Sequence, residues 1–283
     1  MKDWSRSSNT GSHRNASFSF GNPLSSMNPS LPHKQEMTLQ LGDARVRVIS
    51  GGQGPPVLLV HGLAGSSDWW VRNFDVLSRD HAVYLVDLPG FGSMRKYAKQ
   101  FSVAGSAQWL AELLAALNLH QVALVGHSMG GLIAAIFAAR YPERVTKLVL
   151  AAPAIALPHK SVLPFVVPLM KQAMYIHPAF LPTFVRDTAR AGPSILLRAS
   201  RELLNIDIKQ ELAKIAAPSL LIFGEHDPVV PALLGPKLQS EIPGSCLAIL
   251  PRAGHILMYD QPDLFKRTVL EFLSKPSALI DEC

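Results

Sequence analysis

The sequence predicts the α/β class, with a mostly parallel eight-stranded sheet whose two faces are covered by helices. Three observations support this prediction. Short runs of β-branched and apolar residues alternate with helical segments along most of the 283-residue chain. Runs such as residues 57–60 (VLLV) lack alternating polar positions, which is typical of strands buried on both faces. A hydrophobic content of 48% is enough to fill one large core.

Regular patterning begins at Met37. Residues 38–41 and 44–49 alternate in polarity around Gly42-Asp43, which predicts a hairpin with one solvated face. Ser102 is a candidate N-cap for a long amphipathic helix. Further strands are expected at 57–60, 82–86, 122–125, 145–150, 219–224 and 247–250, and helices at 69–77, 102–117, 132–140 and 264–273.

Residues 154–208 interrupt this alternation, because six prolines lie among apolar helical pieces. We interpret the segment as a helical cap inserted over the edge of a core formed by 37–153 and 209–275. An ordinary linker with core-packed helices is the alternative. A helix of the cap lying on a membrane surface is a further possibility, and peripheral contact is the only membrane contact expected.

The two ends of the chain carry no strong pattern. Residues 1–36 are rich in Ser, Asn and Pro and lack the apolar stretch of a secretory signal, so we expect a disordered tail. A transit peptide and a start at Met37 are the alternatives. Residues 276–283 are expected to form a C-terminal tail.

Composition excludes several classes of function. The net charge of +6, from 27 Lys and Arg against 21 Asp and Glu, is spread out, which argues against nucleic-acid binding. Cys246 and Cys283 make no disulfide framework, so a reducing, cytoplasmic location is expected. No apolar run is long enough for a transmembrane helix. No Cys/His cluster or phosphate-binding loop occurs, so we expect no metal, nucleotide or other cofactor.

The most informative stretch is the pentad Gly126-His127-Ser128-Met129-Gly130, which fits G-x-S-x-G. A predicted strand precedes it and a small-residue helix follows, which forces the turn between them into a strained backbone. The flanking glycines leave room for that turn. It would raise the Ser128 hydroxyl above the sheet edge and aim the Met129 N–H at the same space. The alternative is a glycine-rich turn with an incidental serine.

Together with four further motifs, this pentad makes the chain resemble the α/β-hydrolase superfamily. The resemblance is to the branch of single-domain serine hydrolases that carry a cap and are similar to esterases and lipases. The resemblance covers roughly residues 37–275, and the five motifs in this order are specific. They are H-G-L-A-G-S-S from His61, D-L-P-G-F-G from Asp87, G-H-S-M-G-G from Gly126, G-E-H-D-P-V-V-P from Gly224 and A-G-H from Ala253.

The resemblance implies a catalytic triad. Ser128 would be the nucleophile, His255 the base that accepts its proton, and Asp227 the acid that orients His255. Glu225 is the competing candidate for the acid. Some relatives take the acid from just after the preceding strand, but residues 151–155 here contain no carboxylate.

The resemblance also implies an oxyanion hole built from the backbone N–H groups of Leu63 and Met129. His61 and Gly62 would order the first of these two loops. The side chain of His127 is expected to point away from the nucleophile, and Asp87 is expected to fix its own turn. Gly126 and Gly130 would support the turn at Ser128.

The implied activity is hydrolysis of a carboxylic ester through an acyl-enzyme on Ser128. The apolar, proline-rich cap suggests a small-molecule substrate with a hydrophobic acyl or alcohol group. Carbon–carbon bond hydrolysis of a vinylogous diketone is an alternative with the same triad, as is a cofactor-free perhydrolase or haloperoxidase activity. A ligand receptor that turns over slowly is the alternative from another class. Fold alone does not choose among them.

Overall fold

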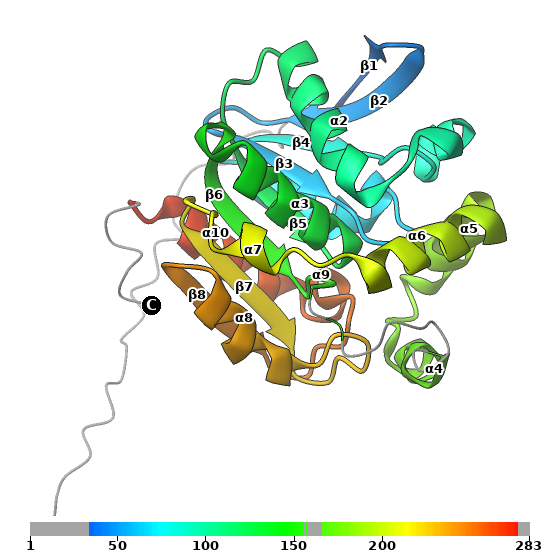
Figure 1. Cartoon of the computed structure of the whole chain (residues 1–283), viewed down its shortest axis with the longest axis vertical. Coiled ribbons are helices and arrows are strands. Elements are labelled where there is room, and N and C mark those ends of the chain that lie inside the picture. The colour runs from blue at the N-terminus through cyan, green and yellow to red at the C-terminus, as the bar shows by residue number, and fades with distance from the viewer. Residues whose placement is uncertain (1–33, 156, 158–165, 277–283) are drawn as a thin grey trace, which may run out of the picture. The chain divides into compact units, whose positions relative to one another are not determined.

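The computed structural model describes residues 34–155, 157 and 166–276, and these form an eight-stranded sheet (Figure 1). The strand order is β1-β2-β4-β3-β5-β6-β7-β8. β1 and β2 are antiparallel to their neighbours, and all the other strand pairs are parallel, which confirms the predicted class. The strands are β1 (Gln35–Leu41), β2 (Ala44–Gly51), β3 (Pro56–Val60), β4 (Ala82–Val86), β5 (Val122–His127), β6 (Val145–Ala151), β7 (Ser219–Gly224) and β8 (Ser245–Leu250).

Helices cover the sheet on both faces. α2 (Val103–Ala116) and α3 (Met129–Arg140) pack side by side in front of the sheet in Figure 1, whereas α10 (Pro262–Ser274) lies behind it and contacts α1 (Val71–Leu77). α8 (Gly235–Glu241) packs on β7 and β8. Shorter helices are the 3₁₀ turns η1 (Ser67–Trp70), η2 (Gly92–Gln100), η3 (Pro142–Arg144) and η5 (Ala232–Leu234), with α7 (Lys209–Leu212) and α9 (Leu257–Asp260).

Among the described residues, four α-helices lie between β6 and β7, and the first three of them are called the cap helices below: α4 (Val166–Tyr175), α5 (Leu181–Ala191) and α6 (Pro193–Asn205). Gly192, with a φ of 77°, makes the turn between α5 and α6. The described part of this segment therefore contains three helices, while its place as a cap inserted over the core and its boundaries at 154 and 208 stay predictions. Residues 156 and 158–165 of the predicted cap lie outside the described part of the chain.

Some element boundaries differ from the expected ones. β1 begins at Gln35, inside the predicted tail, because Gln35 pairs with Ser50 and the Glu36 carboxylate bonds the Arg47 guanidinium at 2.6 Å. η2 was not foreseen. The remaining tail predictions, for 1–33 and 277–283, and the prediction for Cys283 lie outside the described residues. In the described part of the chain, no helix has the length and apolarity needed to span a membrane.

The core is tightest where β5 passes directly into α3. Every residue of β5 is buried, and so are the first ten residues of α3, whose alanines let the helix lie close to the sheet. A Cβ added to Gly130 would lie 2.5 Å from the carbonyl oxygens of both His61 and Val60. These are backbone atoms of a central strand and the loop after it, so they have little freedom to move.

We expect Gly130→Ala to lower the free energy of unfolding by about 2 kcal/mol or more, because overpacking against rigid backbone is destabilising. That corresponds to a fall of at least roughly 3 °C in Tm for a chain of this size. Thermal denaturation followed by circular dichroism measures it. Gly105→Ala in α2 is the control, since its Cβ would meet only the side chain of Ser102, which can rotate away from rigid backbone at the cost of one N-cap hydrogen bond. A Tm for Gly130→Ala at or above that of the wild type would contradict the prediction.

Candidate active site

Ser128 stands at the turn between β5 and α3 in a strained backbone conformation, with a φ of 51° and a ψ of −115°. A non-glycine residue rarely adopts such a positive φ. The turn needs glycine nearby, because a Cβ on Gly126 would lie 2.4 Å from the Gly130 carbonyl oxygen. The structure thus has the strand–turn–helix geometry that the G-x-S-x-G motif requires, with Ser128 at its apex.

His255 and Asp227 lie beside Ser128. His255 Nε2 is 3.0 Å from Ser128 Oγ, and His255 Nδ1 is 2.7 Å from Asp227 Oδ2. The second carboxylate oxygen, Oδ1, accepts the N–H groups of Val229 and Val230 at 2.8 and 2.9 Å. Because the Asp227 carboxylate accepts a hydrogen bond from the Nδ1–H of His255, the Nε2 of the same ring is left to accept the proton of the Ser128 hydroxyl.

Glu225, the competing acid, points elsewhere. Its Oε2 accepts the Arg252 N–H at 2.8 Å, and its side chain is half exposed. Asp227, by contrast, has a fully buried side chain in contact with His255. The geometry therefore brings together the three residues that the motifs predicted, although their catalytic roles stay a prediction.

The loop carrying His255 is held by two side chains that no motif indicated. The Gly254 N–H donates to Asp260 Oδ2 at 3.0 Å, and the His255 N–H donates to Gln172 Oε1 at 3.1 Å. Gln172 belongs to the cap helix α4, so the cap contacts the loop that carries His255 directly. Both residues come from helices with no sequence motif, so only their position in the fold shows their part in the site.

The His127 side chain, which was expected to point away from Ser128, lines the same cavity as Ser128 and bonds a residue of the site. Its Nε2 donates to the His255 carbonyl oxygen at 2.8 Å, and the two imidazole rings lie 4.9 Å apart. Complete burial holds the pKa of His127 well below its usual 6.5, so the ring is neutral. A neutral ring avoids placing a second positive charge beside His255.

The loop after β3 approaches the Ser128 turn closely. A Cβ on Gly62 would lie 2.8 Å from His127 Nδ1 and 3.1 Å from Ser128 Cβ, so only glycine fits. Leu63 follows and shares one cavity with Ser128, while Met129 is the first, buried residue of α3. This arrangement is compatible with backbone donors at Leu63 and Met129, whose role in an oxyanion hole remains a prediction.

His61 orders this loop through both ring nitrogens. The Leu88 N–H donates to His61 Nε2 at 3.0 Å, so Nδ1 carries the proton and donates to the Gly62 carbonyl oxygen at 2.8 Å. Burial lowers the pKa of His61 and keeps the ring in this neutral form. The ring therefore ties the loop after β3 to the loop after β4.

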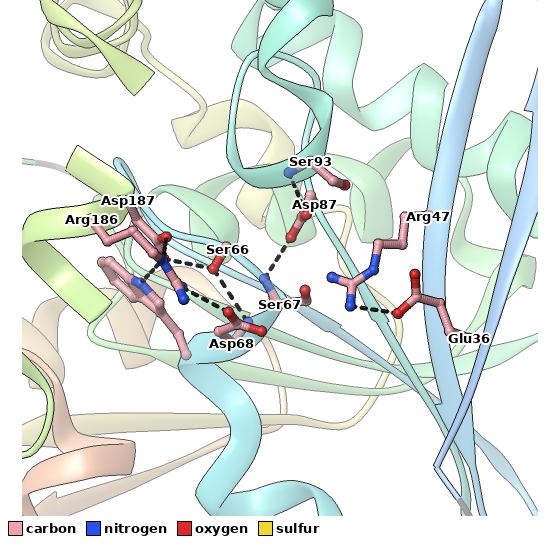
Figure 2. Close-up of polar contacts among 10 residues, drawn as sticks. Glu36, Arg47, Ser66, Ser67, Asp68, Asp87, Ser93, Arg186 and Asp187 are labelled. Atoms are coloured by element: carbon pink, nitrogen blue, oxygen red, sulfur yellow. Dashed lines mark hydrogen bonds and ion pairs between the residues drawn. The ribbon is translucent and has the colours of Figure 1, made fainter. Parts of the chain in front are cut away.

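Asp87 fixes the same region, as Figure 2 shows. Its two carboxylate oxygens accept the N–H groups of Ser67 at 2.6 Å and Ser93 at 2.7 Å. Burial alone would raise the pKa of the carboxyl, but these two N–H donors act against it, and the pKa lies below its usual value. Asp87 thus fixes its own turn, as predicted, and anchors the end of the loop that carries Leu63.

Ser128 and His255 line a cavity of about 370 Å³, and side chains of the cap helices form part of its wall. Most of its lining is aliphatic or aromatic, and none of the described residues that line it is Lys or Arg. In the described ranges, no group of three or more His, Cys, Asp or Glu could hold a metal ion. The cap contributes Gln172, Phe184, Thr188, Leu196, Ser200 and Leu203 to the lining, among others.

Comparison with known proteins agrees with this architecture. Residues 55–203 match the family described as alpha/beta hydrolase fold, and the chain belongs to that family. It is a hydrolase, as are the two relatives described next.

A 2-hydroxy-6-oxononadienedioate/2-hydroxy-6-oxononatrienedioate hydrolase of Burkholderia vietnamiensis is 31% identical, over 82% of this chain and 92% of its own length. A pimeloyl-[acyl-carrier protein] methyl ester esterase of Aeromonas hydrophila is 29% identical, over 78% and 96%. Among solved structures, a bacterial membrane phospholipase A superposes with a TM-score of 0.75 at 28% identity, covering 88% of this chain and 87% of its own.

Asp260 introduces a pH dependence beside the catalytic loop. Burial raises the pKa of its carboxyl to about 6, and Oδ1 has no hydrogen-bond partner among the described residues. The native state therefore binds the Asp260 proton more tightly than the unfolded chain, whose carboxyl has its ordinary pKa near 4. Stability from this group is present below pH about 4 and is lost as the pH rises through about 6.

We expect Asp260→Asn, which keeps an acceptor for the Gly254 N–H without the charge, to stabilise the protein at pH 8 by about 1–2 kcal/mol after allowance for partial solvent contact. The gain should shrink as the pH falls toward 5. Tm measured across this pH range tests it, with Asp75→Asn on the exposed face of α1 as the control for the lost charge. An equal loss of stability at every pH would contradict the prediction.

Proposed function

We propose that this hydrolase cleaves carboxylic esters with a hydrophobic acyl or alcohol group, using Ser128, His255 and Asp227. The observation that carries the proposal is the chain of contacts from Ser128 Oγ to His255 Nε2 at 3.0 Å and from His255 Nδ1 to Asp227 Oδ2 at 2.7 Å, at the wall of an apolar cavity. A serine hydroxyl is a weak nucleophile until such a base accepts its proton.

In the proposed mechanism, Ser128 Oγ attacks the ester carbonyl carbon while its proton moves to His255 Nε2. Asp227 stabilises the imidazolium, and the N–H groups of Leu63 and Met129 would donate to the carbonyl oxygen as it becomes negative. His255 then gives the proton to the leaving alkoxide oxygen, and the alcohol departs. Water, deprotonated by His255, attacks the acyl group on Ser128, and the carboxylic acid is released as Ser128 recovers its proton.

The lining of the cavity supports an uncharged ester. Burying a carboxylate of the substrate without a cationic partner is costly, and none of the described lining residues is Lys or Arg. The Aeromonas relative is named as a methyl ester esterase. Similarity to the Burkholderia relative makes carbon–carbon bond hydrolysis a second candidate. The dienedioate and trienedioate in the name of that relative each carry two carboxylates. The described lining of this cavity offers no Lys or Arg to pair with them.

The first test is covalent labelling of Ser128 with a fluorophosphonate, followed by intact-mass analysis. We expect one adduct on the wild type and none on Ser128→Ala, and Ser128→Ala should lose at least about 10³-fold in kcat on an ester substrate. Asp227→Asn should lose up to roughly 10⁴-fold because His255 would adopt the wrong tautomer.

Glu225→Gln is the matched control for Asp227→Asn, because Glu225 lies two positions away, bonds the Arg252 N–H and does not touch His255. It should hydrolyse esters at close to the wild-type rate. Folded wild type that binds an ester but forms no phosphonate adduct and shows no turnover would favour the ligand-receptor hypothesis instead.

The second test is a panel of p-nitrophenyl esters from acetate to laurate. We expect kcat/KM to rise by about two- to fourfold per methylene until the cavity is filled, since a buried methylene contributes up to about 0.8 kcal/mol. Methyl octanoate should be hydrolysed faster than the methyl half-ester of the matching dicarboxylic acid, which adds a buried carboxylate. A preference for the half-ester, or cleavage of a vinylogous diketone faster than any ester, would contradict the proposal.

A further inference from the structure

Asp187 is a buried carboxylate on the cap helix α5 that contacts the core rather than solvent. It is only 1% exposed, and Figure 2 shows it facing the residues that follow β3. Ser66 Oγ donates to its Oδ2 at 2.6 Å, and Trp69 Nε1 donates to the same oxygen at 3.2 Å. The neighbouring Arg186 Nε donates to Oδ1 at 2.9 Å.

The residues that Asp187 holds belong to the loop that carries Leu63. Ser66 lies three positions after Leu63, and its Oγ also accepts the Asp68 N–H at 3.3 Å, which caps η1. The indole of Trp69 lines the cavity beside Ser128. Asp187 therefore fixes one end of this loop and one wall of the cavity at once.

A second buried carboxylate holds the next residue of the same loop. The Ser67 N–H donates to Asp87, which follows β4 in the core, whereas Ser66 donates to Asp187 in the cap (Figure 2). Adjacent residues are thus anchored to two different parts of the fold. The core anchor is present whenever the sheet is folded, but the cap anchor exists only while α5 lies against η1.

The contacts of Asp187 favour the arrangement in which α5 packs against η1. An ionised carboxylate is stable in the interior only when hydrogen-bond donors and a positive charge surround it, and Ser66, Trp69 and Arg186 supply them. Arg186 also bonds the Asp68 carboxylate at 2.7 Å at the surface, which adds a second link between α5 and η1. Moving α5 away would break the bonds from Ser66 and Trp69 to Asp187 together with the Arg186–Asp68 ion pair, whereas the Arg186–Asp187 pair would move with the helix.

We propose that Asp187 is a positioning residue that aligns the loop carrying Leu63, so that the oxyanion hole is complete only when α5 is seated on the core. This inference rests on the proposed function, because it uses the predicted role of the Leu63 N–H. Closing a lid over a substrate commonly completes a catalytic site and excludes water. In this protein the lid would be the cap helix α5, and its Asp187 carboxylate would bind Ser66 in the loop that carries Leu63.

The test compares Asp187→Asn and Asp187→Ala with the wild type on a p-nitrophenyl ester, with kcat expressed per active site from end-point fluorophosphonate labelling. Losing one oxyanion donor reduces kcat by about 10²–10³-fold, so a displaced donor should reduce it by at least about tenfold. KM should stay within about threefold, because the ground-state ester gains little from that donor. Asp75→Asn, which removes an exposed carboxylate of α1 that the proposal does not use, is the matched control for the lost charge and should retain close to wild-type kcat.

Two further measurements separate positioning from a general loss of structure. A trifluoromethyl ketone forms a negatively charged adduct on Ser128, and its Ki should rise in Asp187→Asn by about the same factor as kcat falls, while the Ki of a neutral alcohol of equal chain length stays unchanged. Ser66→Ala should also lower kcat, and the double variant Ser66→Ala/Asp187→Asn should lose less than the product of the two single losses, because both act through one contact.

The possible failures are distinguishable. A lower Tm for Asp187→Asn with an unchanged kcat per labelled site would overturn the positioning role while leaving the ester hydrolase intact. Equal loss of affinity for the ketone and the alcohol would overturn it too. Wild type that is neither labelled at Ser128 nor active on any ester would refute the proposed function, and the inference about Asp187 with it.

Discussion

The strained backbone at Ser128 is the constraint on which the rest of the site depends. A positive φ at a serine costs about 1–3 kcal/mol and persists only where its surroundings enforce it. Here the Ser128 N–H donates to the Ala151 carbonyl oxygen at 2.9 Å, and the Ser128 carbonyl oxygen accepts the N–H groups of Leu132 and Ala154. The turn is thus fixed by α3 on one side and by the end of β6 on the other. Its rigidity places Oγ where a base from a distant loop can reach it.

The two loops that meet Ser128 are each held by the core and by the cap. The loop with His255 is bonded to Asp260 of α9 and to Gln172 of α4. The loop ending at Ser67 is bonded to Asp87 and, through Ser66, to Asp187 of α5. Two cap helices therefore hold the loops on both sides of Ser128, and a shift of the cap would disturb the proposed base and the predicted oxyanion donors together. On the proposed function, the cap would take part in the chemistry as well as in substrate selection.

The sequence predicted what is encoded locally. The G-x-S-x-G turn, the order of Ser128, Asp227 and His255, and the glycine at 62 each depend on short-range geometry, and the structure has that geometry. Gln172 and Asp187 could not be foreseen, since they sit in helices without motifs and act on residues far away in the sequence. Asp187 even resembles a solvated surface charge, because it follows Arg186 in a polar stretch, and only the packing of α5 on η1 shows that it is buried.

Three buried carboxylates with different partners show how the same group can serve different purposes. Asp87 bonds backbone N–H groups, and Asp187 bonds a hydroxyl, an indole and a guanidinium, none of which passes a proton on at neutral pH. Asp227 alone of the three bonds an imidazole whose other nitrogen reaches a hydroxyl. The first two carboxylates can therefore only hold loops in place, whereas the third is positioned to stabilise a charge that forms and disappears during a reaction. Geometry of the partners, rather than burial, separates the proposed catalytic acid from the two anchors.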